Sequence, residues 1–336
     1  MTNKNSQERS PKRPRTKRKT QYRIRNWPEY NAALVERGSL TVWLDESAMD
    51  GWSNRQKSGK RGASQTYTDS AVWCILTLQV VYRLPLRATE GFLISLFGLL
   101  GLTLPIPDYS TLCRRRQRLK IPLSQSPHPN QKESLHLVVD STGFKVYGEG
   151  EWKVRQHGWS KRRTWRKLHL GIDQASGQVQ AAVVTPPYTS DKAMLPELIA
   201  QVEGHIAQVS GDGGYDYADC YQVLAERGVK ATISPRCNGR IHLRSKRLQG
   251  RNENLERIRE LQGRRRRDQN WGRRQWKKES GYHRRSLVET GVMRLKTLFG
   301  DRLGARTIQG QECELLLRCA ALNKMTVLGM PQSYRL

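Results

Sequence analysis

Acidic side chains stand at two matching places in the sequence, each directly after a short apolar run. Asp140 follows Leu135–Val139, and Asp212 follows Ile206–Ser210 with one glycine between. Such runs, bounded by turn residues, predict buried strands, so we expect both acids at strand ends. On neighbouring strands the two carboxylates would lie side by side and offer the paired oxygens that Mg²⁺ requires. Taken singly, each acid could instead be a helix cap or a turn residue.

A third acid belongs to a helix expected around Ser280–Phe299. Tyr282, Arg285, Glu289 and Lys296 follow one another at intervals of three, four and seven. These positions fall within roughly a 60° arc of a helix and therefore face one side. A carboxylate flanked by cations suits a metal ion beside a phosphate, with Tyr282 stacked on a base or sugar. The alternative is ordinary i,i+4 pairing of Arg285 with Glu289.

The spacing Tyr-x₂-Arg-x₃-Glu-x₆-Lys, present here from Tyr282 to Lys296 without a gap, resembles the signature of bacterial insertion-sequence transposases of the four and five groups. Asp140-Ser-Thr-Gly resembles their first-acid motif and Asp212-Gly-Gly-Tyr-Asp their second. The similarity extends from about Asn26 to Tyr334, and it is closest to the insertion sequence five group.

The resemblance implies a ribonuclease H-like catalytic core and a DDE-type transposase. Asp140, Asp212 and Glu289 would be both catalytic residues and metal ligands. Two Mg²⁺ ions, for which Mn²⁺ could substitute, would sit about 4 Å apart. The partners would be the ends of the element and target DNA, bound by a homo-oligomer. An inactive DNA-binding relative and a metal-dependent nuclease that only hydrolyses DNA are the alternatives.

The charge of the chain favours a nucleic-acid partner independently of these motifs. Lys and Arg number 59 against 30 Asp and Glu, which gives a net charge of +29 and a pI near 10.3. A chain this cationic repels itself unless a polyanion neutralises it. Residues 1–20 carry eight of the basic side chains and no branched aliphatic residue. They predict a disordered arm, which either contacts phosphates or is merely solvated.

A segment rich in Trp and basic residues, Trp152–His169, lies close after the first acid. Alternating aromatic and cationic side chains suit a groove for backbone phosphates and unstacked bases. Trp159 or Trp165 could instead belong to the core, with a basic rim around it. The expected phosphate contacts here are Arg162, Arg163, Arg166 and Lys167.

A second basic segment, Arg236–Ser280, contains 16 Lys and Arg and cannot belong to a hydrophobic core on this composition. It is either a surface excursion that holds DNA or a partly disordered loop. We favour the first, because Trp271 and Trp276 stand among the charges and could stack on bases.

The region before the first acid predicts helices. Apolar residues recur at helical spacing through Asp69–Leu102 and break near Leu84–Pro85, which indicates two antiparallel helices. Asp108 or Ser110 can cap a third helix. Its basic face is either a DNA contact or a solvated surface, and it comprises Arg114, Arg115, Arg116, Arg118 and Lys120.

The remaining pattern predicts an α/β fold, with a mixed sheet flanked by helices. Strands are expected at Leu135–Val139, Lys167–Asp173, Gln178–Thr185, Ile206–Ser210 and Val229–Ser234, and helices at Asp191–Val202, Tyr217–Arg227, Ser280–Phe299 and Ile308–Leu328. We divide the chain into a basic arm (1–20), a helical N-terminal domain for DNA binding or assembly (21–125), and a catalytic domain (126–336) with a basic insertion (236–280).

The six cysteines include no C-x-x-C pair and no histidine at zinc-finger spacing, so free thiols in a reducing compartment are expected. The sequence has no apolar run of membrane-spanning length and no apolar N-terminal segment for secretion. We therefore expect a cytoplasmic bacterial protein, associated with the nucleoid and without a membrane partner.

Overall fold

The computed structural model describes residues 22–44, 49–54, 65–123, 134–146, 165–264 and 268–336. The expected basic arm at 1–20 lies outside these ranges, as do Arg162, Arg163 and most of the segment rich in Trp around them.

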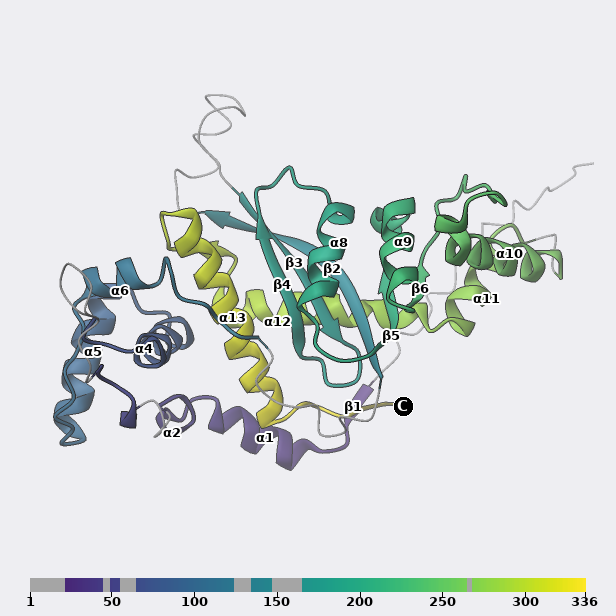
Figure 1. The fold of residues 1–336 in the computed structure, drawn as a ribbon. Coiled ribbons are helices and arrows are strands. Elements are labelled where there is room, and N and C mark those ends of the chain that lie inside the picture. Colours follow the sequence, from purple (N-terminus) through teal and green to yellow (C-terminus); the bar gives the residue numbers. More distant parts are fainter. Residues whose placement is uncertain (1–21, 45–48, 55–64, 124–133, 147–164, 265–267) are drawn as a thin grey trace, which may run out of the picture.

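A mixed sheet forms the centre of the molecule (Figure 1). Its strand order is β4-β3-β2-β5-β6, with a short strand β7 beside the far end of β2. β2, β3 and β4 pair antiparallel, whereas β5 and β6 run parallel to β2. This arrangement is the ribonuclease H-like core, so the expected fold class is confirmed. The strands are β2 (Leu135–Val146), β3 (Trp165–Asp173), β4 (Val179–Thr185), β5 (Ile206–Gly211), β6 (Lys230–Ile233) and β7 (Arg302–Leu303).

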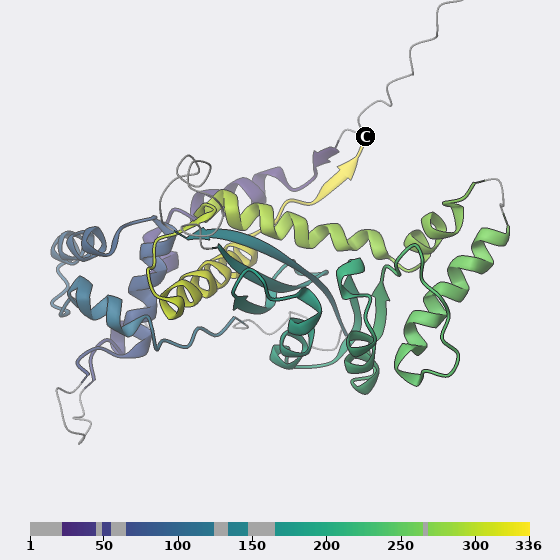
Figure 2. The ribbon, with the colours of Figure 1, turned by 90° about the horizontal axis from the view of Figure 1, so that it is seen from above.

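Helices cover both faces of this sheet, because the apolar side chains of its strands alternate between two cores. On one face Leu137 and Val139 pack with α8 (Asp191–Gln201) and α9 (Ala218–Glu226). On the other, Val138 packs in the cluster that includes residues of α12 and α13. Figure 2 shows these two helix layers on opposite sides of the strands. The second layer comprises α12 (Ser286–Phe299) and α13 (Ile308–Leu328).

α12 lies unusually close to the sheet. A Cβ atom at Gly291 would stand 2.5 Å from Ile172 Cδ1 on β3, so a larger residue here would displace the end of that side chain. Gly291 is two residues beyond Glu289, so this close contact fixes the start of α12 against the strands.

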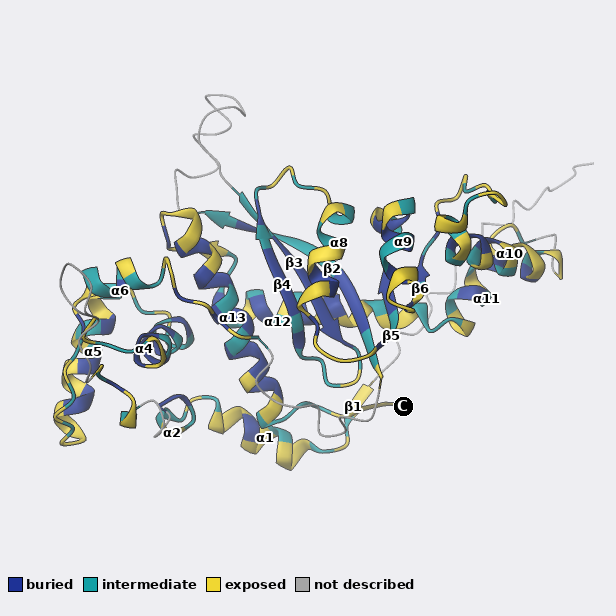
Figure 3. Ribbon diagram, in the orientation of Figure 1, coloured by how far each residue is buried: buried dark blue, intermediate teal, exposed yellow. Residues whose placement is uncertain are grey.

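The N-terminal helices share a core with the sheet. α4, whose buried residues include Ala71, Val72 and Ile75, packs on α13, and one hydrophobic cluster contains residues of both helices and of β2 and β3. Burial is deepest along the strands and α13 (Figure 3). The helices of this region are α1 (Trp27–Glu36), α2 (Leu40–Trp43), α4 (Asp69–Val81), α5 (Leu86–Leu99) and α6 (Tyr109–Arg115). The two ends of the described chain meet where β1 (Tyr22–Ile24) pairs antiparallel with β8 (Ser333–Arg335).

Two expectations for the N-terminal helices were wrong. α4 and α5 run in different directions instead of antiparallel (Figure 1), because Arg83 between them adopts a left-handed backbone, φ 55°. Arg115 does not belong to a free basic face, since it pairs with Asp69 at 2.5 Å and donates to Tyr67 O. Asp108 does cap α6, accepting from the backbone N–H groups of Ser110 and Thr111.

The basic insertion is ordered over its described length. α10 (Gln249–Gly263) and α11 (Trp271–Glu279) form a hairpin at one end of the molecule (Figure 1). They enclose a small core of Ile258, Leu261 and Trp276, so the expectation of a segment without a core was wrong. The sequence concealed this core because its few apolar residues are spread among many charges. Trp276 is 3% exposed and donates to Asn254 Oδ1, so it is not a free stacking surface.

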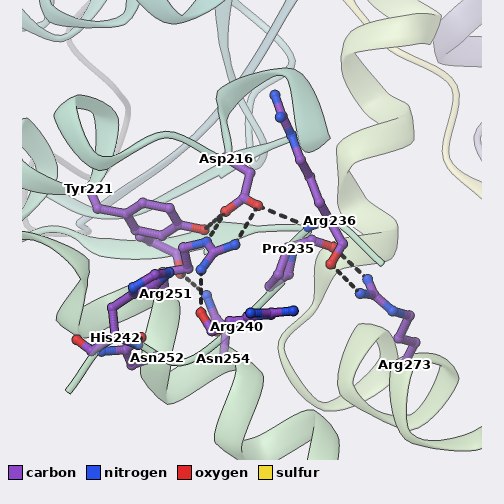
Figure 4. Close-up of polar contacts among 11 residues, drawn as sticks. Asp216, Tyr221, Pro235, Arg236, Arg240, His242, Arg251, Asn252, Asn254 and Arg273 are labelled. Atoms are coloured by element: carbon purple, nitrogen blue, oxygen red, sulfur yellow. Dashed lines mark hydrogen bonds and ion pairs between the residues drawn. The ribbon is translucent and has the colours of Figure 1, made fainter. Parts of the chain in front are cut away.

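A buried charge network joins this insertion to the core (Figure 4). Asp216 Oδ1 accepts from Arg251 Nε at 2.7 Å and from Tyr221 Oη at 3.1 Å. Its other oxygen accepts from Arg236 N at 2.9 Å, and Arg251 Nη1 donates to Arg240 O at 2.8 Å. Asp216 and Arg251 are each less than a tenth exposed, so the pair is shielded from solvent. It links α10 to the loop that leaves β5.

All six cysteines are free, as expected. Within the described ranges, no helix combines the length and apolarity needed to cross a membrane.

Candidate active site

Asp140 lies in the middle of β2, not at its end as the sequence suggested. The strand continues through Ser-Thr-Gly to Val146, because β3 pairs with it along that length, Gly143 opposite Lys167. A Cβ at Gly143 would meet Trp165 Cε3 at 3.2 Å. The glycine thus makes room for the indole ring that lies over the strand.

Asp212 stands beside Asp140, because the two strands that precede these acids are neighbours in the sheet, the condition that the sequence had left open. β5 is the parallel neighbour of β2, and Val138 is paired with Ser210. Each acid is two residues beyond its member of that pair, so both lie at the same level of adjacent chains, which are about 4.8 Å apart. Asp212 follows the last residue of β5 and caps the next turn, with Oδ1 accepting from Gly214 N at 2.8 Å.

Arg285 brings Glu289 to this pair. Its Nη1 lies 3.3 Å from Asp140 Oδ2, and its Nη2 donates to Glu289 Oε1. One guanidinium therefore spans the acid of β2 and the acid of α12. The i,i+4 pair considered from the sequence exists, and the same arginine makes the additional bond to the sheet. Helix α12 begins at Ser286, after a 3₁₀ turn, which is later than the expected start at Ser280.

The electrostatics of Asp140 reflect its crowded position. Its side chain is 24% exposed, and burial raises its pKa. The carboxylates of Asp212 and Asp191 raise the pKa further, while the Ser141 N–H and Arg285 counteract this effect. The carboxylates of Asp140, Asp212 and Asp191 therefore lie close enough to repel one another, and a cation bound between them would be stabilised.

Family models for the transposase DDE domain match this chain over residues 35–149 and over residues 131–324. The chain belongs to the DDE transposase family. Among solved structures, it is similar to a piggyBac transposase in a synaptic complex with hairpin DNA, with 12% sequence identity and a TM-score of 0.39. That match covers 88% of this chain and 74% of the other. On the family matches, the protein is a DNA transposase, an enzyme that cuts and joins DNA, and its family uses divalent metal ions.

The transposase has a fourth acid at this site, Asp191, for which the sequence pattern indicates only the start of a helix. Lys167 Nζ lies 2.8 Å from its Oδ1, and His169 Nδ1 lies 3.2 Å from the same oxygen. Burial alone would raise the pKa of Asp191, but its contacts with His169, Lys167 and Ser141 outweigh burial and lower it. Asp191 is therefore charged at neutral pH. The role of Asp191 becomes visible only in the folded structure, because its partners Lys167 and His169 belong to the distant strand β3.

These contacts also place Lys167 and His169. Lys167, expected to bind phosphate, is held by Asp191 and donates to Thr189 O at 3.1 Å. His169 is fully buried, with Nε2 2.9 Å from Thr185 Oγ1. This histidine therefore packs in the interior of the transposase, where it contacts Asp191.

The other expected DNA contacts lie apart from the acids or are engaged otherwise. Arg166 Nε donates to Gln311 Oε1 of α13 at 2.6 Å. Lys296 Nζ lies 5.4 Å from the centre of the Phe144 ring, and burial lowers the pKa of this lysine. Tyr282 packs on Trp276, their ring centres 5.5 Å apart.

Tyr215 carries an unpaired polar atom in this region. Its side chain is 1% exposed, and its hydroxyl has no hydrogen-bond partner among the described residues. Burial raises the pKa of Tyr215, and the carboxylates of Asp191, Asp140 and Asp212 raise it further, so the phenol stands close to all three acids. It remains protonated, and its O–H dipole can stabilise an ionised carboxylate.

The donor set fits a hard divalent cation. Asp140 of β2 and Asp212 after β5 lie at the same level of adjacent strands, Arg285 links Asp140 to Glu289 of α12, and carboxylate oxygens are the preferred ligands of Mg²⁺. In the part of the chain that the structure describes, no group of three or more His, Cys, Asp or Glu side chains is already close enough to hold a metal ion. Arg285 contacts both Asp140 and Glu289 in this arrangement.

Proposed function

We propose that this transposase cuts the ends of a mobile element and joins them to target DNA at Asp140, Asp212 and Glu289. The observation that carries the assignment is the Arg285 bridge, together with the parallel pairing of Val138 with Ser210. Both observations support a single site formed by three acids that are distant in the sequence, with 72 residues from Asp140 to Asp212 and 77 from Asp212 to Glu289.

The three acids would hold two Mg²⁺ ions, and Mn²⁺ would substitute for them. When bound, the ions would supply Lewis-acid activation of the attacking and leaving oxygens of the DNA. Carboxylates from two strands and a helix suit this task, because rigid elements keep the ligands in place.

The protein side chains would orient the DNA around the acids. Arg285 has a planar guanidinium that can donate to two oxygens of one phosphate. Lys167, fixed by Asp191, places a second positive charge beside β2. We infer that Asp191 is a positioning residue, since it holds Lys167 and His169 without itself being one of the three acids.

The remaining features of the proposal follow the resemblance. We propose membership of the insertion sequence five group, a homo-oligomer on DNA, and association with the bacterial nucleoid. We also propose that residues 21–125 serve DNA binding or assembly and that residues 126–336 form the catalytic unit, with the insertion at 236–280.

One assay separates this function from its alternatives. The protein is incubated with Mg²⁺, a supercoiled target plasmid and a short duplex carrying the end of the element. Joined product supports transposition, and cut product without joining identifies a nuclease. Binding without either product identifies an inactive relative, and the proposal then fails.

A further inference from the structure

A cavity of about 970 Å³ is lined by residues of both the N-terminal helices and the catalytic core. Its wall combines the end of α4, the start of α5, α6, the end of α12 and the start of α13. Residues far apart in sequence therefore face one hollow, at the opposite end of α12 from Glu289.

Positive charge dominates this wall. Six arginines line the cavity, and among the described residues that line it Glu314 is the only carboxylate. Glu314 is already engaged, because it accepts from Arg318 at 2.6 Å and from the backbone N–H of Ala305 at 2.9 Å. Five arginines remain without a carboxylate partner in the described part of the chain: Arg83, Arg87, Arg114, Arg116 and Arg306.

The backbone adds to this positive field. The N-terminal ends of two helices lie in the cavity wall. Leu86 and Arg87 belong to the first turn of α5, and Thr307 is the N-cap residue of α13. The N-terminus of a helix carries partial positive charge and free N–H groups, which favour a phosphate. These helices are 14 and 21 residues long.

Arg83 occupies this wall in a conformation that arginine rarely adopts. Its φ of 55° is the only positive value among the described residues other than glycine. Its guanidinium lies against Gly300, where a Cβ would stand 2.8 Å from Arg83 Nη2. Burial lowers the pKa of the neighbouring Arg318, Glu314 opposes this effect, and Arg83 lowers the pKa further, so Arg83 adds a second cation beside the Arg318–Glu314 pair. Such an arrangement is relieved by a bound anion.

The cavity lies at a defined distance from the acids. Phe299 lines it and follows Glu289 by ten residues on α12, which corresponds to about 15 Å along the helix. Lys296 lies between them, and both Lys296 and Arg318 approach the ring of Phe144, at 5.4 and 5.8 Å. Positive side chains therefore continue from the acids to the cavity.

We propose that this arginine cavity binds phosphate groups of the DNA strand whose cleavage occurs at the acids. With one phosphate per 3.4 Å of each strand along a duplex, 15 Å corresponds to about four nucleotides from the cut. That the bound phosphates belong to the DNA strand being cut rests on the proposed function. That the cavity binds phosphate rests on its arginines alone.

The salt dependence of DNA binding tests the proposal. Binding of a duplex is measured in EDTA by fluorescence anisotropy at several salt concentrations, for the wild type and for the variant R83Q/R87Q/R306Q. Removing one arginine–phosphate interaction lowers the slope of log K against log salt by about 0.9, so the slope should fall by two to three. The variant K230Q/K324Q/R335Q removes equal charge from exposed positions of β6, α13 and β8, outside the cavity and outside residues 21–125 and 236–280, and should keep the wild-type slope. Equal slopes for all three proteins overturn the proposal.

Two further measurements keep the test decisive. If the cavity variant unfolds, a duplex with a neutral methylphosphonate about four nucleotides from the mapped cut replaces it, and wild-type binding should weaken only for that position. Stabilisation of the wild type by inorganic phosphate, combined with an unchanged DNA slope in the variant, would assign the cavity to a free anion and refute the DNA strand. Since binding in EDTA needs no catalysis, failure of strand cleavage leaves this test intact.

Discussion

Arg285 Nη1 lies 3.3 Å from Asp140 Oδ2, and this contact ties the turn before α12 to the middle of β2. It joins residues 145 positions apart in the sequence. Because the same guanidinium holds Glu289, the contact determines how far the helix acid stands from the sheet acid.

Replacing Arg285 by Gln should reduce the single-turnover cleavage rate by about 100-fold, because the reacting phosphate then has no charged donor at this position. Lysine should restore only part of the rate, since a single ammonium cannot span two oxygens as a guanidinium does. The control is Arg284→Gln, which removes an exposed arginine bonded to Gln174 Oε1 and should leave the rate within threefold. An R285Q protein as fast as R284Q would refute the role of Arg285.

Asp191→Asn should lower the cleavage rate about tenfold or more while DNA affinity changes little. The amide loses the negative charge that holds Lys167 and His169, so the lysine leaves its place beside β2. Asp191→Glu keeps the negative charge. A higher cleavage rate for this variant than for Asp191→Asn would show that the charge, and not the packing, is required. Asp219→Asn is the matched control, because this exposed acid also lies in the first turn of a helix. Equal rates in the two Asn variants would remove Asp191 from the site.

Removing one partner of the Asp216–Arg251 pair should be costly. Arg251→Met leaves the Asp216 carboxylate buried without its cation, which destabilises a protein by about 3–5 kcal/mol. The double variant D216L/R251M should recover part of that stability, because it leaves no isolated buried charge. Urea unfolding measures both. If the single variant costs no more than the double one, the network does not stabilise the link between α10 and the core.

His136 should make the stability of the protein depend on pH just below neutrality. Burial lowers the pKa of His136 below its ordinary 6.5, and Arg284 and Lys230 lower it further, although Asp173 opposes them. The unfolded chain then binds a proton more readily than the folded one, so stability rises with pH and the gain is complete above about 6.5. His136→Gln can keep the contact with Ser210 Oγ and should lose this dependence between pH 5.5 and 7. Identical melting profiles for the two proteins over that range would contradict the assignment.

Local patterns in the sequence were sufficient for most elements of the core. The hairpin of β3 and β4, the helix α8 and the 21-residue α13 appear close to the expected residues, because their apolar periodicity is strong and their ends carry turn or cap residues. The positions of Asp140 and Asp212 after two apolar strands followed from the same patterns, whereas the pairing of these strands, which brings the two acids together, comes from the structure.

Contacts between distant segments could not be predicted in this way. The full length of β2 depends on pairing with β3, which the polar residues after Asp140 do not signal. The bond from Arg285 to the sheet and the partners of Asp191 arise from the packing of helices on strands. The hairpin of α10 and α11 remained hidden because its core residues, such as Ile258 and Trp276, are few among many charges.

The most direct test of the account substitutes cysteine for each of Asp140, Asp212 and Glu289 and compares strand cleavage in Mg²⁺ and in Mn²⁺. A thiolate is a poor ligand for Mg²⁺ and a better one for softer metals. We expect cleavage to disappear in Mg²⁺ for all three variants and to return at least in part in Mn²⁺, whereas Asp219→Cys stays active in both. Retained cleavage in Mg²⁺ by any of the three would show that the residue does not hold the metal and would contradict the proposed centre.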